Sequence, residues 1–149
     1  MESEIKMNII LASKSPRRKE LLSKLGIDFQ TIFLNVDETV DNYQSPVDYV
    51  RQIVLHKGNL ASQSNPNDLV ICADTIVVCE NKILEKPKSQ EEAHQIIKLL
   101  SGKVHQVLTA VCIVYQNNFN IFIEQTDVQV VKLLDSEIEE YIMTSEPYD

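Results

Sequence analysis

The chain has 149 residues, of which 44% are hydrophobic and 24% charged, and its formal net charge is −8. This length fits one domain with a substantial core. The acidic balance excludes general binding to a nucleic-acid polymer, which needs a basic face, but it leaves room for a local basic pocket that binds a nucleotide. No apolar run approaches the length of a membrane span, and the acidic beginning MESEIKMNII lacks a signal-peptide layout. We therefore expect a cytoplasmic protein without membrane contact.

The first informative stretch is residues 8–26, NIILASKSPRRKELLSKLG. Its apolar beginning, residues 9–11, predicts a short buried strand. Ser15 followed by Pro16 predicts a helix start, and Gly26 predicts the end of that helix. A loop rich in hydroxyl and cationic side chains therefore leads from the strand directly into a helix N-terminus.

Two interpretations of this loop remain open. Unpaired backbone N–H groups at a helix N-terminus attract anions, and the hydroxyl of Ser13 with the guanidinium groups of Arg17 and Arg18 would strengthen phosphate binding there. Cations at this end of a helix also oppose its dipole by about 0.3–1 kcal/mol each. The arginines therefore indicate either an anionic partner or plain solvent exposure.

A second strand is predicted over residues 28–34, where apolar side chains roughly alternate with polar ones. The polar segment that follows, residues 35–44, contains Asp37, Glu38 and Asp41. Such a cluster is either a solvated acidic loop or a source of carboxylate ligands, and charge clusters in general are more often solvated.

Ser45 and Pro46 predict the start of a longer helix, whose apolar residues recur at helical spacing on one face. Lys57 lies on that same face, where a lysine is normally disfavoured. Its side chain either extends along the edge of the core with its ammonium group in water or reaches into a cleft to neutralise phosphate.

The run LVICADTIVVC, residues 69–79, is the most apolar of the chain and predicts a central strand. Asp74 and Thr75 interrupt it. A carboxylate inside such a strand must pair with a cation, bind a metal, take up a proton or lie where the strand opens to water. Because buried ionisable groups cluster at functional sites, we favour a functional role for Asp74.

The three cysteines lie in apolar runs without metal-ligand spacing and are expected to be buried, reduced thiols.

The second half of the chain continues with a strand at residues 83–84 and a helix that begins after Ser89 and ends at Gly102. Strands are predicted over residues 104–115 and 120–134, joined by a turn near residues 117–118. Ser136 and Glu139 predict a capping box on a last helix. These elements predict one domain, residues 1–149, with a mixed twisted sheet flanked by helices.

Several short motifs occur in one order along the chain: LASKSPRRKELLSKLG at residues 11–26, VDE at 36–38, Lys57, ADT at 73–75, KP at 86–87 and SGKVHQVLTAV at 101–111. Each motif is weak alone, but the ordered set resembles the Maf family of nucleoside triphosphate pyrophosphatases, which is linked with septum formation and cell division arrest. The resemblance implies an α/β fold with a central cleft, similar to that of the inosine triphosphate pyrophosphatases. It also implies hydrolysis of nucleoside triphosphates to monophosphate and pyrophosphate, with a divalent metal, Mg²⁺ or Mn²⁺, in a house-cleaning role.

The resemblance also implies roles for individual residues. Asp74 matches the family's proton acceptor, while Arg17 and Thr75 match positions linked to base specificity. The Arg17-Arg18 pair is similar to the branch that acts on dTTP and UTP, and modified pyrimidine nucleotides are expected to be accepted. Other polar residues match the lining of the cleft: Ser13, Arg18, Glu38, Lys57 and Lys86. Asp74 would also bind the divalent metal, together with Glu38. A homodimer is an open alternative to a monomer.

The sequence departs from the family pattern at two places. The family continues after an EPxD segment with a DKAGxYGIQG-like motif, which carries an active-site lysine and glutamine and is followed by closing strands, whereas this sequence ends on EPYD. We therefore expect the C-terminal segment to be lacking and a sheet edge to be open. Gly58 stands where the family tends to have alanine, and a glycine inside a helix costs about 0.5–1 kcal/mol.

Three functional hypotheses follow. The leading one is a nucleoside triphosphate pyrophosphatase with a preference for dTTP and UTP. The alternative is a catalytically impaired nucleotide-binding remnant or regulatory module, motivated by the lacking segment. A generic scaffold for protein contacts is the third, and it explains neither Asp74 nor the arginine pair.

Overall fold

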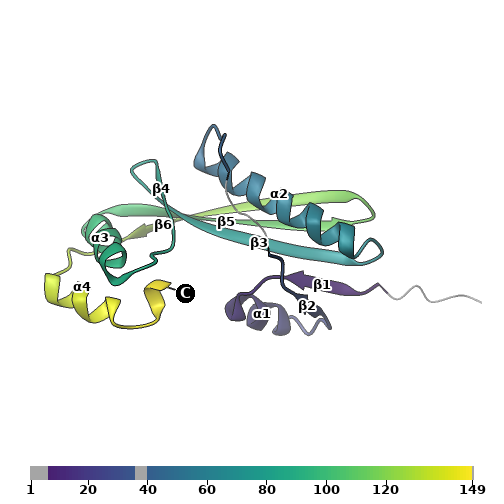
Figure 1. Ribbon diagram of the computed structural model, residues 1–149, viewed down its shortest axis with the longest axis horizontal. Coiled ribbons are helices and arrows are strands. Elements are labelled where there is room, and N and C mark those ends of the chain that lie inside the picture. The colour runs from purple at the N-terminus through teal and green to yellow at the C-terminus, as the bar shows by residue number, and fades with distance from the viewer. Residues whose placement is uncertain (1–6, 36–39, 149) are drawn as a thin grey trace, which may run out of the picture. The chain divides into compact units, whose positions relative to one another are not determined.

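The computed structural model describes residues 7–35 and 40–148 (Figure 1). Strands and helices alternate through the first part of the chain, and a long hairpin and a last helix follow. The elements are β1 (Ile9–Ala12), α1 (Pro16–Ser23), β2 (Gln30–Ile32), α2 (Pro46–Ser64), β3 (Leu69–Cys79), β4 (Lys82–Leu84), α3 (Gln90–Leu100), β5 (Val104–Tyr115), β6 (Asn118–Gln129), α4 (Asp135–Ile142) and a 3₁₀ turn, η1 (Glu146–Tyr148).

The strands form one mixed sheet in the order β2-β1-β3-β5-β6, with β4 paired to β3. β1 is parallel to both of its neighbours, and Ala12 pairs with Ile32 of β2 and with Cys72 of β3. β4 runs antiparallel to β3. The mixed sheet flanked by helices that the sequence predicts is confirmed, whereas the central cleft stays a prediction.

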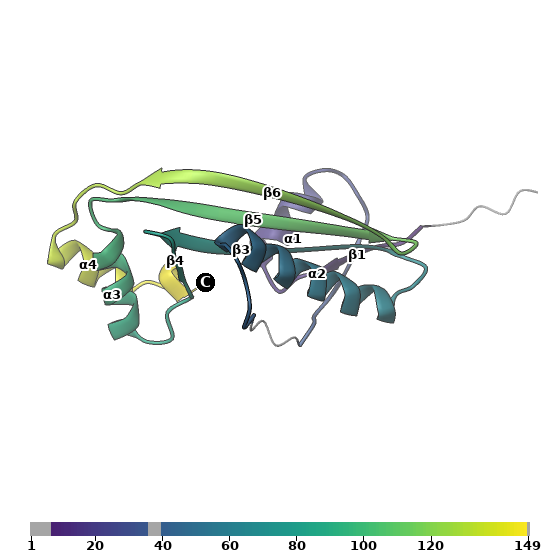
Figure 2. The ribbon, with the colours of Figure 1, turned by 90° about the horizontal axis from the view of Figure 1, so that it is seen from above.

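Two tight turns join antiparallel strands. The β3–β4 turn and the β5–β6 turn, seen at the end of the long hairpin in Figure 2, each contain two residues with positive φ. These are Glu80 and Asn81 in the first turn, and Gln116 and Asn117 in the second. Two successive left-handed residues give the turn whose twist matches a β-hairpin, and asparagine tolerates that conformation well. The predicted hairpin is therefore confirmed, with its turn one residue earlier than expected.

The chain divides into two compact units, and the division falls within β3, β5 and β6. The first unit comprises Met1–Asp74 and Thr109–Glu124, and the second comprises Thr75–Leu108 and Gln125–Asp149. Each unit has its own buried residues. Among the described residues, no helix is both long and apolar enough to cross a membrane.

The core of the first unit forms where α2 packs on the sheet. The buried residues of α2 share one face of the helix, at relative positions i, i+3, i+4, i+8 and i+11: Val50, Ile53, Val54, Gly58 and Ala61. They meet buried side chains of β3 and β5, among them Cys72 and Cys112. The helical spacing in the sequence thus correctly predicts the buried face of α2.

The second unit has a smaller cluster between α3 and α4. Ala93, Ile138 and Ile142 are its buried members, and Ile97, Leu133 and Tyr148 pack against them. Tyr141 is 37% exposed. Its position one residue before Ile142 turns it toward the rim of the cluster.

The predicted N-terminal caps agree with the structure in three helices out of four. Ser15, Ser45 and Ser89 are N-caps whose side chains accept a backbone hydrogen bond three residues on. The capping box expected at Ser136 and Glu139 is wrong, because α4 begins at Asp135 with Leu134 as N-cap. There the carboxylate of Glu137 accepts a hydrogen bond from the backbone N–H of Leu134 at 3.0 Å.

Some strand boundaries were predicted too long. β2 covers Gln30–Ile32 where residues 28–34 were expected, and β6 ends at Gln129 where residue 134 was expected. After β6, the backbone N–H of Leu133 donates to the hydroxyl of Ser101 at 2.7 Å. This bond to a side chain fixes the backbone beyond the strand end.

The caps give a direct test. Replacing Ser89 with alanine removes the acceptor for the N–H of Glu92 and is expected to lower the free energy of unfolding by about 1 kcal/mol, measured by urea titration. Ser136→Ala is the matched control, because the structure gives Ser136 no capping role. Equal effects of the two substitutions would contradict the assigned caps.

Candidate active site

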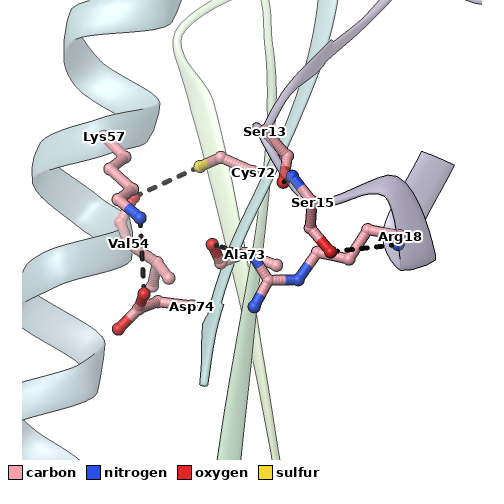
Figure 3. A network of polar contacts seen from close by, with 8 residues as sticks. All are labelled: Ser13, Ser15, Arg18, Val54, Lys57, Cys72, Ala73 and Asp74. Atoms are coloured by element: carbon pink, nitrogen blue, oxygen red, sulfur yellow. Dashed lines mark hydrogen bonds and ion pairs between the residues drawn. The ribbon is translucent and has the colours of Figure 1, made fainter. Parts of the chain in front are cut away.

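The candidate site lies where the carboxyl end of β1 meets the middle of β3. These strands are parallel neighbours, and Ala12, the last residue of β1, pairs with Cys72. The loop that begins at Ser13 therefore leaves β1 beside Ala73 and Asp74, which continue within β3 (Figure 3). In parallel sheets ligands commonly bind where strands end, because the loops and helix starts lie there.

The loop between β1 and α1 is held by its own hydroxyl groups. The hydroxyl of Ser13 accepts a hydrogen bond from the backbone N–H of Ser15 at 3.1 Å. The hydroxyl of Ser15 in turn accepts from the backbone N–H of Arg18 at 3.3 Å, which makes Ser15 the N-cap of α1. Pro16 occupies the first helical position, where its lack of an N–H has no cost. The loop thus reaches the helix in a defined conformation.

The two arginines of α1 lie in different environments. Nη1 of Arg18 donates to the carbonyl oxygen of Ala73 at 3.0 Å, and the side chain is partly buried. Arg17 is exposed. Plain solvent exposure therefore does not describe Arg18, whose guanidinium group is fixed against the residue next to Asp74, as Figure 3 shows.

Lys57 and Asp74 form an ion pair. Nζ of Lys57 lies 3.4 Å from Oδ1 of Asp74, and the two side chains are 13% and 16% exposed. Of the alternatives open for Asp74, pairing with a cation is confirmed. The lysine stem runs from α2 to the strand, so its ammonium group meets a carboxylate instead of bulk water. Such pairing offsets much of the cost of burying either charge.

The thiol of Cys72 lies between these groups and the core. Sγ of Cys72 donates to the carbonyl oxygen of Val54 on α2 at 3.4 Å. A hydrogen bond with Cys112, followed by burial, raises the pKa of the Cys72 thiol well above its usual value, although the nearby charges of Lys57 and Arg18 act in the opposite direction. Cys72 is therefore a neutral thiol, and all three cysteines are buried and free as expected.

The remaining predicted site residues are placed as follows. Thr75 and Lys86 belong to the second unit, and both are exposed. Glu38 lies outside the described residues. Over residues 7–35 and 40–148, no three His, Cys, Asp or Glu side chains gather in a way that could hold a metal ion.

Sequence reasoning missed three contributions to the site. The first is the carbonyl oxygen of Ala73, which accepts a hydrogen bond from Arg18. The other two are Cys72, which donates to the backbone of α2, and Gly58, which packs closely against the sheet. A backbone carbonyl leaves no mark in the sequence. Cys72 could have been found, because it shares with Asp74 the even positions of β3 that face one side of the sheet.

A family model described as Maf-like protein matches residues 8–149. The chain belongs to the Maf family. A dTTP/UTP pyrophosphatase of Bacillus cereus is 43% identical over 148 residues, which are 99% of this chain and 73% of that protein. The same-named protein of a second B. cereus strain is 44% identical over 141 residues, 95% of this chain and 74% of that protein.

Solved structures confirm the expected fold of this Maf-family chain. It is similar to the Ham1 protein of Staphylococcus aureus, with a TM-score of 0.61 and 14% identity over 82% of this chain and 71% of that one. It is also similar to a nucleoside-triphosphatase, dITP/XTP pyrophosphatase, of Mycobacterium abscessus, with a TM-score of 0.56 and 11% identity over 85% and 76% of the two chains.

The ion pair can be tested by removing one charge at a time. Lys57→Met leaves the carboxylate of Asp74 buried without this partner and is expected to lower the free energy of unfolding by about 3 kcal/mol in a denaturant titration. Adding Asp74→Asn to Lys57→Met removes the carboxylate charge and should restore part of that loss. If the two substitutions were simply additive, the pair would not be coupled in the folded protein.

Proposed function

We propose that this chain hydrolyses nucleoside triphosphates, dTTP and UTP foremost, to the nucleoside monophosphate and pyrophosphate. One observation supports this above the others: the partly buried Lys57–Asp74 pair lies next to Ala73, whose carbonyl oxygen accepts a hydrogen bond from Arg18 at the N-terminus of α1. A base, two cations and the N–H groups of a helix start are the parts that attack on a phosphoric anhydride requires. The curated relatives named dTTP/UTP pyrophosphatase support the same activity.

Asp74 is the proposed proton acceptor. Water attacks the α-phosphorus, a bond forms between its oxygen and that phosphorus, and the bond to the oxygen bridging the α- and β-phosphates breaks. Pyrophosphate leaves, and the proton of the water goes to Asp74. The pairing of Asp74 with Lys57 holds the carboxylate in a defined position, from which Asp74 is proposed to orient the water.

The cations act on the phosphate oxygens. As the attack proceeds, negative charge accumulates on the oxygens around the α-phosphorus and on the leaving group. Lys57 and Arg18 lie on either side of the Ala73–Asp74 segment and can neutralise that charge without a large movement (Figure 3). Ser13 and Lys86 are proposed as further triphosphate contacts.

A divalent metal, Mg²⁺ or Mn²⁺, is proposed as cofactor. A magnesium site of the type that uses one or two carboxylates and completes its shell with water and phosphate oxygens would need few protein ligands. Asp74 would hold the metal together with Glu38. When bound, the metal would neutralise phosphate charge and lower the pKa of a coordinated water.

Base selection is proposed for Arg17 and Thr75. Both side chains are exposed, so neither is part of the hydrophobic core.

The alternative of a non-catalytic nucleotide-binding module is not favoured, because the relatives that match nearly all of this chain are named as pyrophosphatases. A homodimer, a cytoplasmic location and a house-cleaning role linked to cell division arrest stay predictions.

The catalytic role of Asp74 predicts a specific loss. Asp74→Asn should lower kcat for pyrophosphate release from UTP by about 10²–10⁴-fold, because the amide cannot accept the proton. Circular dichroism should show an unchanged fold, and chelation by EDTA should abolish the wild-type activity reversibly. Failure of the wild-type chain to release pyrophosphate from any nucleoside triphosphate with Mg²⁺ or Mn²⁺ would refute the proposed function.

The two arginines predict different kinetic effects. Arg17→Ala should change the ratio of kcat/KM between UTP and ATP, because Arg17 is proposed to contact the base. Arg18→Ala should lower kcat/KM for every nucleotide by a similar factor, because a phosphate contact is shared by all of them. Interchanged results would reverse the two assignments.

A further inference from the structure

Gly58 lies in the closest contact between α2 and the sheet. It is buried, and it is the next residue after Lys57. A Cβ atom built on Gly58 would lie 2.9 Å from Sγ of Cys112, 3.1 Å from Cγ2 of Val114 and 3.5 Å from Sγ of Cys72. The first two distances are shorter than ordinary contacts between such atoms, so even the smallest side chain would force a shift.

The atoms around Gly58 have little freedom to move aside. Val114 is β-branched and restricted at χ1. Cys72 and Cys112 are fully buried. Cys72 also donates to the carbonyl of Val54, one turn before Gly58, so the thiol holds the helix to the strand at this point. A side chain at position 58 would therefore move the helix more readily than its neighbours.

Movement of α2 would act directly on the ion pair. Lys57 is adjacent to Gly58 on the helix, and Asp74 is two residues beyond Cys72 on the same face of β3. The distance of 3.4 Å between Nζ of Lys57 and Oδ1 of Asp74 is already near the upper limit of a hydrogen bond. A displacement of α2 away from β3 would lengthen this distance beyond the hydrogen-bond limit and weaken the ion pair.

We propose that Gly58 is a positioning residue, which lets α2 approach the Cys72–Cys112 pair closely enough for Lys57 to reach Asp74. Local preference opposes glycine here, because alanine is favoured over glycine inside a helix. Steric fit against the two sulfur atoms is the reason that glycine is suited to this position. The inference rests on the proposed function only for its kinetic consequence.

The experiment compares wild type, Gly58→Ala, Cys112→Ala and the double variant Gly58→Ala/Cys112→Ala. Removing Sγ of Cys112 takes away the shortest contact, so the methyl group added in the double variant meets only one contact shorter than usual, that with Cγ2 of Val114 at 3.1 Å. Asn59→Ala is the control on the exposed side of the same helix. The readouts are the rate of Lys57 acetylation by an N-hydroxysuccinimide ester, followed by peptide mass spectrometry, and kcat/KM for pyrophosphate release from UTP.

Gly58→Ala is expected to raise the acetylation rate of Lys57 several-fold and to lower kcat/KM by about 10–100-fold, as for other small misplacements of catalytic groups. The double variant should restore both readouts toward those of Cys112→Ala alone, and Asn59→Ala should change neither. The proposal would be overturned if Gly58→Ala showed the wild-type acetylation rate of Lys57 and the wild-type kcat/KM. It would also be overturned if adding Cys112→Ala to Gly58→Ala restored neither readout.

Acetylation separates this proposal from the proposed function. If the wild-type chain hydrolysed no nucleotide, the proposed function would fail while the protection of Lys57 still reported on the position of the helix. If Gly58→Ala failed to fold, as judged by circular dichroism, refolding of the double variant with Lys57 protected would support the proposal. A double variant that also failed to fold, or that folded with Lys57 unprotected, would overturn it.

Discussion

The charge of Asp74 is the constraint on which the candidate site depends. A carboxylate in the middle of the most apolar strand is costly unless a cation compensates it, and Lys57 provides that cation from α2. The pair requires the helix to lie close to β3 and the lysine to point toward the sheet. The same charge that makes the strand unusual therefore also fixes how α2 packs in the first unit.

Packing and chemistry are combined in one short segment of β3. Cys72 binds the helix through the carbonyl of Val54, Ala73 holds Arg18 through its own carbonyl, and Asp74 pairs with Lys57. Three successive residues thus join one strand to both of its helical neighbours. A polar network of this kind is rigid when its members are satisfied, which suits a site that must position a reacting water.

Much of this arrangement could be predicted from the sequence. The apolar run 69–79 was assigned its observed bounds, and the serine caps of α1, α2 and α3 were assigned correctly, because they depend on local chemistry. Lys57 and Asp74 were each recognised as unusual, yet their pairing required knowledge of how α2 lies on β3. Gly58 was interpreted as a mild helix defect, because the sulfur atoms that make glycine fit come from residues 14 and 54 positions away. Contacts between distant segments leave no periodic pattern in the sequence.

The most direct test of this account is a crystal structure of the chain with a non-hydrolysable UTP analogue and Mg²⁺. The account predicts that the α-phosphate lies beside residues Ala73 and Asp74 of β3, within hydrogen-bonding distance of Lys57, with Asp74 facing the phosphorus and Arg18 on the adjoining side. An analogue bound elsewhere, with the Lys57–Asp74 pair closed and remote from every phosphate, would contradict it.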